Sequence, residues 1–594
     1  MAFLLGAFGD FCNSDRIEKL FHIALQQSAE GTLKTMTVGK GIVFAGQKLD
    51  EKYHYDQVIP LHANQGLLVG KLFDREKCNA VKFNADYAPL LIDNPQKISD
   101  LFWGRYVGVL YNMTSKAITL IRDPQGLSTL FYVQNSDGII FSTEIELLYK
   151  VLEIKPSIDL TYFAEHIINK NQSLPTTPFQ GIKELLPGMG LCVTLDGKIS
   201  QMLLWNISSL KSSFITDENA FEEELLATLK SCTKAWVGDA SGVCVELSGG
   251  ADSSGIMLLL QSLLPDDKKL MAVNYIDSQT QSSNEIEHAQ EVADVCNVSL
   301  HFLDWQNASL FDKLPHSWRP NKPSSLLLFY NHRKQLQELA WQNNCPEIMN
   351  GQGGDHVFLA PPPINALADH WLDHGFNGIT TSIKGLSSVY RMPLMPLIYD
   401  NAKAVVNYYG KFHASQSSST LFLNKNFAKT FKQHEFYIKN TLNKFYPAKA
   451  IQIESLCQAV AFSERDQFAY NTIITHPLLS QPIVELALKI PTYQSFKDGY
   501  DRIFFRRAIS RIKKTKSLWR MIKGQTTGTI VKQCAYHAQD IKDIILNGKL
   551  VSGGMIDKNW LNKELVQMRH GQAENLWPII HILTGQLWLN QWEL

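Results

Sequence analysis

Net charge, paired cysteines and long apolar runs are scarce in this sequence of 594 residues. Lys plus Arg and Asp plus Glu balance at 57 each, so no overall field directs the chain to nucleic acid or to an anionic membrane. The nine cysteines form no C-x-x-C pair, which disfavours a disulfide framework and a zinc site. No apolar run approaches the roughly 18 residues of a membrane span, and the first ten residues lack the basic start of a signal peptide. We therefore expect a soluble, cytoplasmic protein.

The two parts of the chain differ in their residue pattern. Residues 1–205 alternate β-rich segments with Asp-Gly and Pro-Gly turns, including a hairpin turn at 135–138. Residues 206–220 are rich in Ser and Asn and predict a linker that ends where a helix begins. Strands and helices then alternate, which predicts a parallel, doubly wound sheet, and from about residue 366 the pattern is mainly helical.

The stretch CVELSGGADSSG, at 244–255, joins a predicted strand to a predicted helix. Gly249 and Gly250 let the backbone turn and bring N–H groups close to an anion at the positive end of the helix. A lone Gly-Gly is more often a tight turn, but Asp252 among anion-binding groups makes chemical sense with a cation between them. The pattern therefore predicts phosphate bound together with Mg²⁺. The hydroxyl donors are Ser248, Ser253 and Ser254.

The Ser-Gly-Gly-x-Asp-Ser turn resembles that of the PP-loop ATP pyrophosphatases, which hold the β,γ-phosphates of ATP while AMP is transferred. Three further matches make the chain similar to the asparagine synthetase superfamily. They are GQGGDHVF at 351–358, HPLLSQPIVELALKIP at 476–491, and the N-terminal segments LIRDPQGLSTLFY and LPGMG. The resemblance implies ATP and Mg²⁺ as cofactors.

The same resemblance implies an α/β fold with two domains. Residues 1–208 would form a degenerate Ntn-hydrolase domain of the αββα type, similar to class II glutamine amidotransferases. Residues 216–594 would form a PP-loop synthetase domain, a doubly wound parallel α/β domain with a largely helical C-terminal part.

Site residues are implied by position in the matched motifs. Asp252 and Asp355 would hold the metal, although a turn role in a Gly-rich loop is the plain alternative for Asp355. Lys523, on a C-terminal loop, would supply the cation for acyl transfer, with Arg520 as its rival. Gln352 and His356 are the other catalytic candidates. The ATP and pyrophosphate site would comprise Leu247, Ser248, Gly249, Gly250, Asp252, Ser253, Ser254, Asn274, Glu285, Gly351, Gly353 and Gly354. A capping role at a helix start explains Glu285 equally well.

Two departures from the superfamily pattern decide the predicted branch. Glutamine-using members need Cys directly after the initiator Met, because its free α-amine is the base for the thiol. This chain begins Met1-Ala2, and its nearest thiol is Cys12. Asparagine synthetases carry Glu, and β-lactam synthetases Tyr, where this chain has Gln352. Gly-Gly-Asp-His resembles instead the lasso-peptide cyclases.

The predicted function is therefore an ATP-dependent lasso-peptide cyclase. It would adenylate an Asp or Glu side chain of a leader-free core peptide and join it to the peptide's N-terminal amine as a macrolactam. Alternatives are an atypical asparagine synthetase, a β-lactam synthetase-like enzyme, a tRNA-modifying PP-loop enzyme and a non-catalytic scaffold. The implied partners are a precursor peptide, a leader-peptide-recognition protein and a leader peptidase, with no nucleic acid and no membrane. The segment WRPNKPSS, at 318–325, either lines a peptide groove or is a plain loop.

Overall fold

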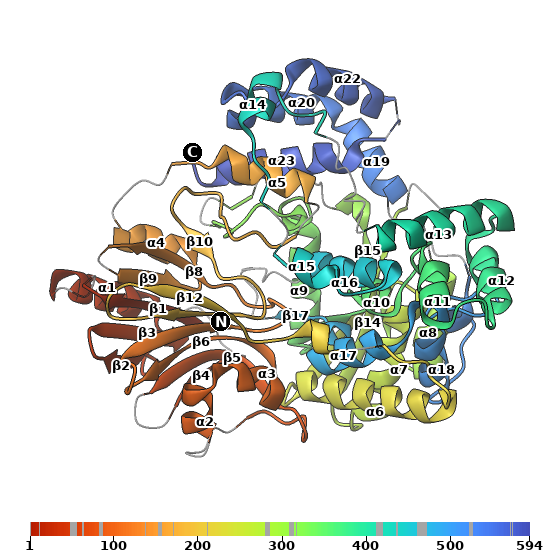
Figure 1. The fold of residues 1–594 in the computed structure, drawn as a ribbon, viewed down its shortest axis with the longest axis horizontal. Coiled ribbons are helices and arrows are strands. Elements are labelled where there is room, and N and C mark those ends of the chain that lie inside the picture. The colour runs from red at the N-terminus through yellow and green to blue at the C-terminus, as the bar shows by residue number, and fades with distance from the viewer. Residues whose placement is uncertain are drawn as a thin grey trace.

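An antiparallel part and a parallel part lie side by side in the computed structural model (Figure 1). The structure describes residues 2–10, 12, 14–47, 56–61, 65–81, 87–136, 138–152, 157–169, 172–210, 212–278, 285–307, 314–315, 318–410, 420–434, 437–459, 472–521, 527–570, 572 and 574–593.

Two six-stranded antiparallel sheets stack face to face in the N-terminal part. One has the order β10-β8-β9-β1-β3-β2 and the other β12-β11-β7-β6-β5-β4. Their facing sides share one core, to which Leu4 and Val43 contribute from the first sheet and Val107 and Leu191 from the second. The strands of the first sheet are β1 (Ala2–Gly9), β2 (Lys34–Val38), β3 (Gly41–Gln47), β8 (Phe131–Asn135), β9 (Gly138–Ser142) and β10 (Lys183–Glu184). Those of the second are β4 (Gln57–Pro60), β5 (Gly66–Asp74), β6 (Phe102–Asn112), β7 (Ala117–Arg122), β11 (Met189–Val193) and β12 (Ile199–Leu203).

Helices cover the outer faces of both sheets, which completes the αββα order expected from the sequence. The helices α1 (Ser14–Gln27) and α4 (Ile145–Leu152) pack on the first sheet, and α2 (Tyr87–Asp93) and α3 (Ile98–Leu101) pack on the second. The predicted hairpin at 135–138 is the connection between β8 and β9.

A five-stranded parallel sheet forms the second part, in the order β15-β14-β13-β16-β17. Its strands are β13 (Gly242–Glu246), β14 (Lys269–Ile276), β15 (Leu300–Asp304), β16 (Glu347–Asn350) and β17 (Ile473–Thr475). The helix α6 (Glu218–Val237) precedes β13, and the strands are followed in turn by α7 (Ala251–Leu263), α8 (Ile286–Cys296), α9 (Tyr330–Gln342) and α10 (Gly354–Phe358). The predicted doubly wound sheet is confirmed, with α9 packed on one face and α7 and α8 on the other. The short strand β17 is an exception to the helical pattern expected after residue 366.

Helices dominate the C-terminal part, as predicted. They are α11 (Ala366–His374), α12 (Ile379–Tyr390), α13 (Leu394–Tyr409), α14 (Lys425–Thr430), α15 (Lys439–Leu442), α16 (Pro447–Ala459), α17 (Gln481–Lys489), α18 (Ile503–Ser510), α19 (Thr527–Tyr536), α20 (Ala538–Leu546), α21 (Lys549–Ser552), α22 (Lys558–Arg569) and α23 (Leu576–Gln591). None of the helices in the described ranges has the length and apolar content that a membrane-spanning segment requires.

The last helices return to the N-terminal part of the molecule. The helix α23 packs on α5 (Leu160–Ile168), and one hydrophobic core joins Phe3 and Phe163 to Leu583 and Trp588. The described structure therefore links the two predicted domains through a shared core, and their boundary at 208–216 stays a prediction.

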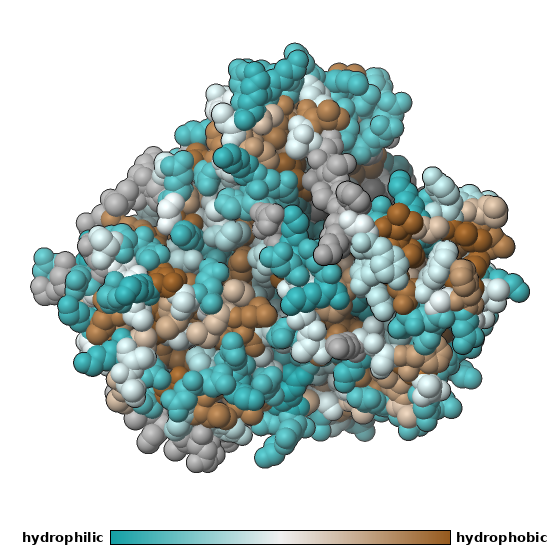
Figure 2. All heavy atoms as spheres, in the orientation of Figure 1, coloured by the Kyte–Doolittle hydropathy of each residue, from teal (hydrophilic) through white to brown (hydrophobic). Residues whose placement is uncertain are grey.

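Figure 2 shows hydrophobic colour at the surface over α12 and α13. Large apolar side chains of α13 are exposed at both ends of the helix, from Met395 and Tyr399 to Val406 and Tyr409. The described structure thus leaves much of the apolar surface of α13 in contact with solvent.

Two buried histidines meet where α5 packs on α23. The ring centroids of His166 and His581 are 5.4 Å apart and the rings are nearly perpendicular. Burial lowers the pKa of His166 well below its usual value and lowers that of His581 to about 4. In the described part of the chain, Nε2 of His166 and Nδ1 of His581 have no hydrogen-bond partner. Both rings are therefore neutral at pH 7.

Acid should loosen this interface between α5 and α23. An exposed histidine in the unfolded chain has a pKa of about 6.5, so as the pH falls the unfolded state binds protons first. The free energy of unfolding should decrease below about pH 6.5, by about 1.4 kcal/mol per pH unit for each histidine. For His581 the decrease should stop below about pH 4. Thermal midpoints recorded from pH 7.5 to 5.0 check this, and His581→Leu should flatten the dependence. An equal dependence in the two proteins would contradict it.

Candidate active site

The glycine loop between β13 and α7 is fixed by its contacts with β14 and α8. The backbone N–H of Leu247 donates to the carbonyl of Val273 at 2.7 Å, and the amide of Asn274 donates to the carbonyl of Leu247 at 2.7 Å. Gly249 has φ +75°, and a Cβ there would lie 2.8 Å from the Cβ of His288. Glycine is therefore required at this close approach. Asn274, predicted to contact the nucleotide, is bonded to the backbone of the loop.

The donors of the loop face the start of α7. Ser248 is exposed, its hydroxyl lies 3.0 Å from that of Ser253, and it accepts from the N–H of Gly250 at 3.3 Å. The 13-residue helix α7 follows Gly250 with no side-chain cap. Uncapped N–H groups at a helix start form a binding site for an anion. Ser254, also predicted to bind phosphate, is fully buried in the first turn.

A second glycine-rich loop, after β16, packs directly on Asp252. A Cβ at Gly351 would lie 2.5 Å from the backbone N of Ser253, and a Cβ at Gly354 would lie 2.5 Å from Cγ of Asp252. Gly353 has φ +89°, a left-handed conformation that glycine adopts readily. The three glycines therefore let the loop that carries Asp355 approach the first loop.

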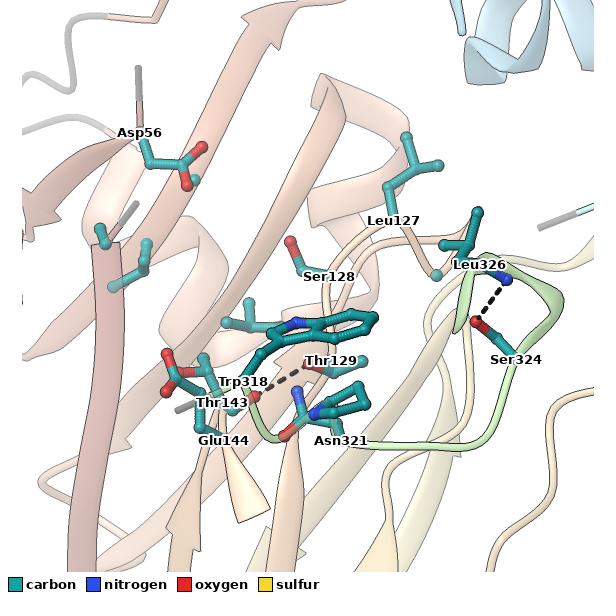
Figure 3. A pocket seen from close by; sticks show the side chains of 16 residues that line it. Asp56, Leu127, Ser128, Thr129, Thr143, Glu144, Trp318, Asn321, Ser324 and Leu326 are labelled. Atoms are coloured by element: carbon teal, nitrogen blue, oxygen red, sulfur yellow. Dashed lines mark hydrogen bonds between the residues drawn. The ribbon is translucent and has the colours of Figure 1, made fainter. Parts of the chain in front are cut away.

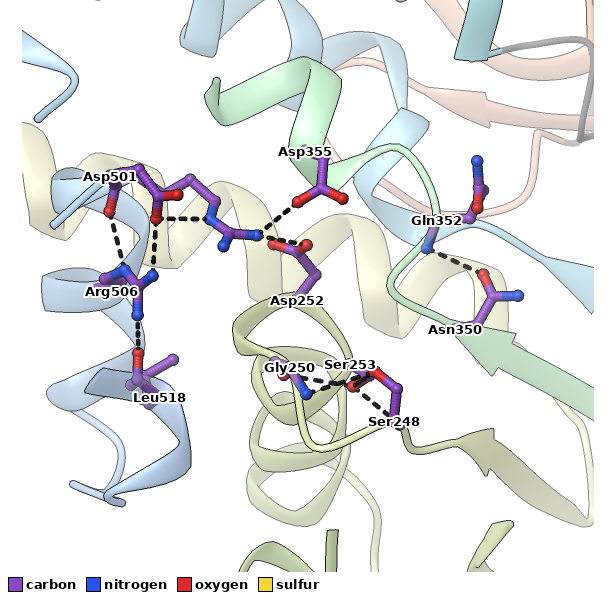
Figure 4. A network of polar contacts seen from close by, with 11 residues as sticks. Ser248, Gly250, Asp252, Ser253, Asn350, Gln352, Asp355, Asp501, Arg506 and Leu518 are labelled. Atoms are coloured by element: carbon purple, nitrogen blue, oxygen red, sulfur yellow. Dashed lines mark hydrogen bonds and ion pairs between the residues drawn. The ribbon is translucent and has the colours of Figure 1, made fainter. Parts of the chain in front are cut away.

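The side chains of Asp252 and Asp355 face the same guanidinium group, that of Arg502 (Figure 4). Its Nη1 lies 2.6 Å from Oδ2 of Asp252 and 2.8 Å from Oδ1 of Asp355. Asp501 accepts from Nε of Arg502 at 3.2 Å and from Arg506 at 2.6 Å. Burial alone would lower the pKa of Arg502, but the three carboxylates raise it above its usual value. The two residues predicted to hold the metal are therefore close to each other, and both contact the buried guanidinium of Arg502.

These residues fit a Mg²⁺ ion that also binds phosphate. Oxygens of Asp252 and Asp355 lie within 2.8 Å of one nitrogen, which places them close enough to share one small cation. Mg²⁺ prefers oxygen ligands at about 2.0–2.1 Å, and in nucleotide sites it takes one or two carboxylates together with phosphate oxygens. Within the described ranges, no group of three or more His, Cys, Asp or Glu side chains is placed to hold a metal. The remaining ligands would therefore have to come from substrate or water.

The segment before the predicted Lys523 loop is attached to α8, beside the glycine loop. Both carboxylate oxygens of Glu291 accept backbone N–H groups, that of Lys516 at 2.7 Å and that of Ser517 at 2.9 Å. A few residues on, Arg520 donates through Nη2 to Oε1 of Glu285 at the start of α8. The positive charge of Arg520 is thus compensated by Glu285. Lys523 itself lies outside the described residues, and its role stays a prediction.

The other candidates of the second loop have structural contacts. The ring of His356 is bonded through Nδ1 to the hydroxyl of Ser455 on α16 at 2.5 Å. The backbone N–H of Gln352 donates to Oδ1 of Asn350 at 3.1 Å, and His476 contacts the same oxygen at 2.7 Å. Their catalytic roles stay predictions.

Arg502, Asp501 and Arg506 were missed by the sequence analysis. The sequence does contain one indication of a buried ion pair. The charged residues Asp501 and Arg502 are followed directly by the apolar residues Ile-Phe-Phe. A charged pair entering a buried helix indicates ion pairing inside the protein.

A cavity of about 80 Å³ lies in the N-terminal part, against a loop from the second part (Figure 3). The first residue of β1, Ala2, is among the residues that line it. Trp318 and Asn321 close it from the other side, with Oδ1 of Asn321 accepting from the backbone N–H of Ile145 at 3.0 Å. The described lining contains no cysteine. Residues from both ends of the segment at 318–325, from Trp318 to Ser324, thus line this cavity.

Comparison with known proteins identifies the family. The asparagine synthase family matches residues 224–592, and the glutamine amidotransferase domain matches residues 92–205. The chain belongs to the asparagine synthase family. Its fold is α/β, with an N-terminal glutamine amidotransferase-like domain and a C-terminal asparagine synthase domain of the PP-loop type.

Individual relatives match only parts of the chain. Asparagine synthetase [glutamine-hydrolyzing] 3 of Bacillus subtilis (strain 168) is 31% identical over 136 residues, 23% of this chain and 22% of the relative. Amidase chry2 of Gibberella zeae is 22% identical over 276 residues, 43% of this chain and 39% of the relative. The matched segments thus cover about a fifth and two fifths of these relatives.

Similarity to solved structures is weak. The allosteric regulatory enzyme of purine biosynthesis shows 11% identity and a TM-score of 0.24 over 51% of this chain and 80% of its own. The NH3-dependent NAD synthetase from Campylobacter jejuni shows 15% identity and a TM-score of 0.19 over 32% of this chain and 96% of its own. TM-scores this low give no information about the site.

Replacing Gly354 should disrupt the site without unfolding the protein. In Gly354→Ala the new Cβ would overlap the carboxylate of Asp252, so the second loop would have to move away. We expect Mg²⁺-dependent ATP affinity to fall at least about tenfold, equivalent to 1.4 kcal/mol, in equilibrium titrations.

Gly528→Ala is the matched control, because a Cβ there meets nothing within 4 Å and the residue is helical. It should bind ATP as the wild type does, with a thermal midpoint that is equal or higher. Equal affinity in both variants would contradict the close packing of the two loops.

Proposed function

We propose that the chain is an ATP-dependent ligase that forms a carbon–nitrogen bond by way of an acyl-adenylate. The observation that carries the proposal is the meeting of Asp252 and Asp355 beside the uncapped start of α7. An anion-binding helix end and two carboxylates within reach of one cation suit the triphosphate of ATP. Membership of the asparagine synthase family supports the same reaction class.

Different residues of the site bind the phosphates of ATP and the metal. The loop N–H groups and the hydroxyls of Ser248 and Ser253 hold the β- and γ-phosphates. Asp252 and Asp355 would hold a Mg²⁺ ion, which would supply positive charge beside the phosphates. A substrate carboxylate oxygen attacks the α-phosphorus, the bond to pyrophosphate breaks, and the carboxyl group becomes an adenylate. An amine then attacks the acyl carbon, loses a proton, and AMP leaves with the former carboxylate oxygen.

For the substrate, we propose an Asp or Glu side chain of a leader-free core peptide, with the N-terminal amine of the same peptide as the nucleophile. Holding both groups in one site would contribute about 7–11 kcal/mol through orientation. Gln352 supports this assignment, because an amide cannot be the general base that a carboxylate at this position would provide. The Gly-Gly-Asp-His sequence of the second loop supports the same branch, that of the lasso-peptide cyclases.

The N-terminal domain, in this proposal, is a platform and not a source of ammonia. Ala2, at the start of β1, is among the residues that line the cavity, and the lining that the structure describes offers no thiol. Cys12 is half-buried, and burial raises the pKa of its thiol to about 11, so it is not a thiolate at neutral pH. An amine carried by the peptide itself removes the need for glutamine hydrolysis.

The proposed pathway gives the enzyme three partners, none of which its own residues identify. The precursor peptide supplies the substrate, a leader-peptide-recognition protein delivers it, and a leader peptidase frees the amine that closes the ring. All three steps would take place in the cytoplasm.

ATP–pyrophosphate exchange combined with product mass tests the proposal. Peptides with a small first residue and an acidic residue seven to nine positions on should stimulate exchange and lose one water. Asp252→Asn should lose both activities, whereas Glu223→Gln, at an exposed position of α6, should retain them. Exchange with free aspartate alone would instead indicate an asparagine synthetase-like enzyme. No exchange with any substrate, with the partner proteins added, would contradict the proposal.

Separate variants distinguish the two candidate cations. Lys523→Met should lower kcat by roughly 10²–10³, the usual cost of losing one transition-state donor, and leave the KM for ATP nearly unchanged. Arg520→Met should mainly raise the KM for ATP, because Arg520 is already paired with Glu285 beside the glycine loop. The converse pattern would make Arg520 the transition-state cation. Steady-state kinetics with the peptide substrate give both constants.

A further inference from the structure

Arg502 occupies the space between the two carboxylates that the proposed function assigns to the metal. One nitrogen, Nη1, contacts both Asp252 and Asp355, and the Arg502 side chain is 5% exposed. Mg²⁺ bound at about 2.0–2.1 Å from both carboxylates would overlap this nitrogen. The guanidinium and the metal therefore exclude each other.

We propose that Arg502 is a built-in substitute for the metal, which holds the two carboxylates together until nucleotide and metal arrive. This inference rests on the proposed use of ATP and not on the identity of the peptide. When the metal binds, Nη1 leaves the carboxylates and donates to the phosphates that arrive with it. Arg502 is thus a positioning residue before ATP binds and a phosphate ligand afterwards.

The charge of the surrounding cluster supports this exchange. Three carboxylates, those of Asp252, Asp355 and Asp501, face two guanidinium groups, those of Arg502 and Arg506. Without Arg502, Asp252 and Asp355 would lie close together with one compensating charge fewer, which is unfavourable. With both the metal and Arg502 present the cluster gains positive charge, which a polyphosphate neutralises. A metal without phosphate therefore displaces Arg502 and gives its guanidinium no new partner, whereas a metal that arrives with phosphate supplies one.

The backbone of Arg502 indicates that its position is imposed by these contacts. The residue has φ +52°, a left-handed conformation that costs a non-glycine residue on the order of 1 kcal/mol. It precedes the first turn of α18, where its carbonyl accepts from the N–H of Arg506 at 3.0 Å. Asp501 binds Nε at 3.2 Å, a contact that keeps the guanidinium beside the site when Nη1 turns away.

Binding of Mn²⁺, followed by electron paramagnetic resonance, tests the exchange in the full chain. Without nucleotide, Arg502→Gln should bind Mn²⁺ at least about tenfold more tightly than the wild type, a gain of 1.4 kcal/mol. At saturating Mn²⁺, the same variant should bind α,β-methylene-ATP at least about fivefold more weakly. If Arg502 served only to hold the two loops together, the variant would bind both Mn²⁺ and α,β-methylene-ATP more weakly. A Mn²⁺ affinity that is unchanged or lower in Arg502→Gln therefore overturns the inference.

Thermal unfolding gives a second readout that needs no nucleotide. Metal that binds only the folded state raises the midpoint, so Mn²⁺ should stabilise Arg502→Gln more than the wild type. If that variant does not fold, Arg502→Lys replaces it, with a smaller rise in Mn²⁺ affinity expected because one charge remains. No rise in Arg502→Lys overturns the inference.

Two further variants locate the effect. Arg507→Gln removes a charge from the same helix, where Arg507 pairs with Glu218 at 2.6 Å, and should leave both affinities unchanged. Adding Asp355→Asn to Arg502→Gln should abolish the gained Mn²⁺ affinity. A gain that persists in this double variant places the ion elsewhere and overturns the inference. A wild type that forms no Mn²⁺–nucleotide complex would contradict the proposed function itself, whereas a normal complex with no change in Arg502→Gln contradicts this inference alone.

Discussion

The parallel pairing of β13 with β16 is the constraint on which the site depends. The two central strands run in register from Val243 opposite Glu347 to Glu246 opposite Asn350, so their loops leave the sheet at the same edge. One loop ends in the helix that carries Asp252 and the other in the helix that carries Asp355. Glycines at the contact remove the side chains that would keep the loops apart. Two carboxylates distant in sequence thereby become neighbours on one cation.

Contacts outside the sheet hold the neighbouring segments and the N-terminal domain in place. Glu291 and Glu285 attach the segment before the predicted Lys523 loop to α8, which also contacts the glycine loop. The C-terminal helices pack on the N-terminal domain, where Trp588 lies in one core with Phe3. The indole N–H of Trp588 donates to the carbonyl of Pro320 at 2.7 Å, in the loop that closes the cavity beside Ala2. The amidotransferase-like domain is thus built into the structure of the enzyme.

Local sequence patterns were enough to predict the two loops of the site. The strand, the two glycines and the helix around Asp252 are consecutive in the chain, and the GQGGD segment carries its own turn signal, so both loops could be placed. Arg502 could not be placed, because its partners lie 250 and 147 residues away and no periodicity connects them. The strand β17 is three residues long, too short for an alternating pattern. The helix α23 is apolar on all sides, which indicates burial but not the surface on which it packs.

The position of the metal relative to the two loops tests the central claim most directly. Crystals grown with Mn²⁺ and α,β-methylene-ATP would reveal the ion by its anomalous scattering. The account predicts one Mn²⁺ within about 2.3 Å of an oxygen of both Asp252 and Asp355, with phosphates at the start of α7 and Arg502 turned away from the carboxylates. An ion bound elsewhere, or phosphates bound while Arg502 still bridges the two carboxylates, would contradict it.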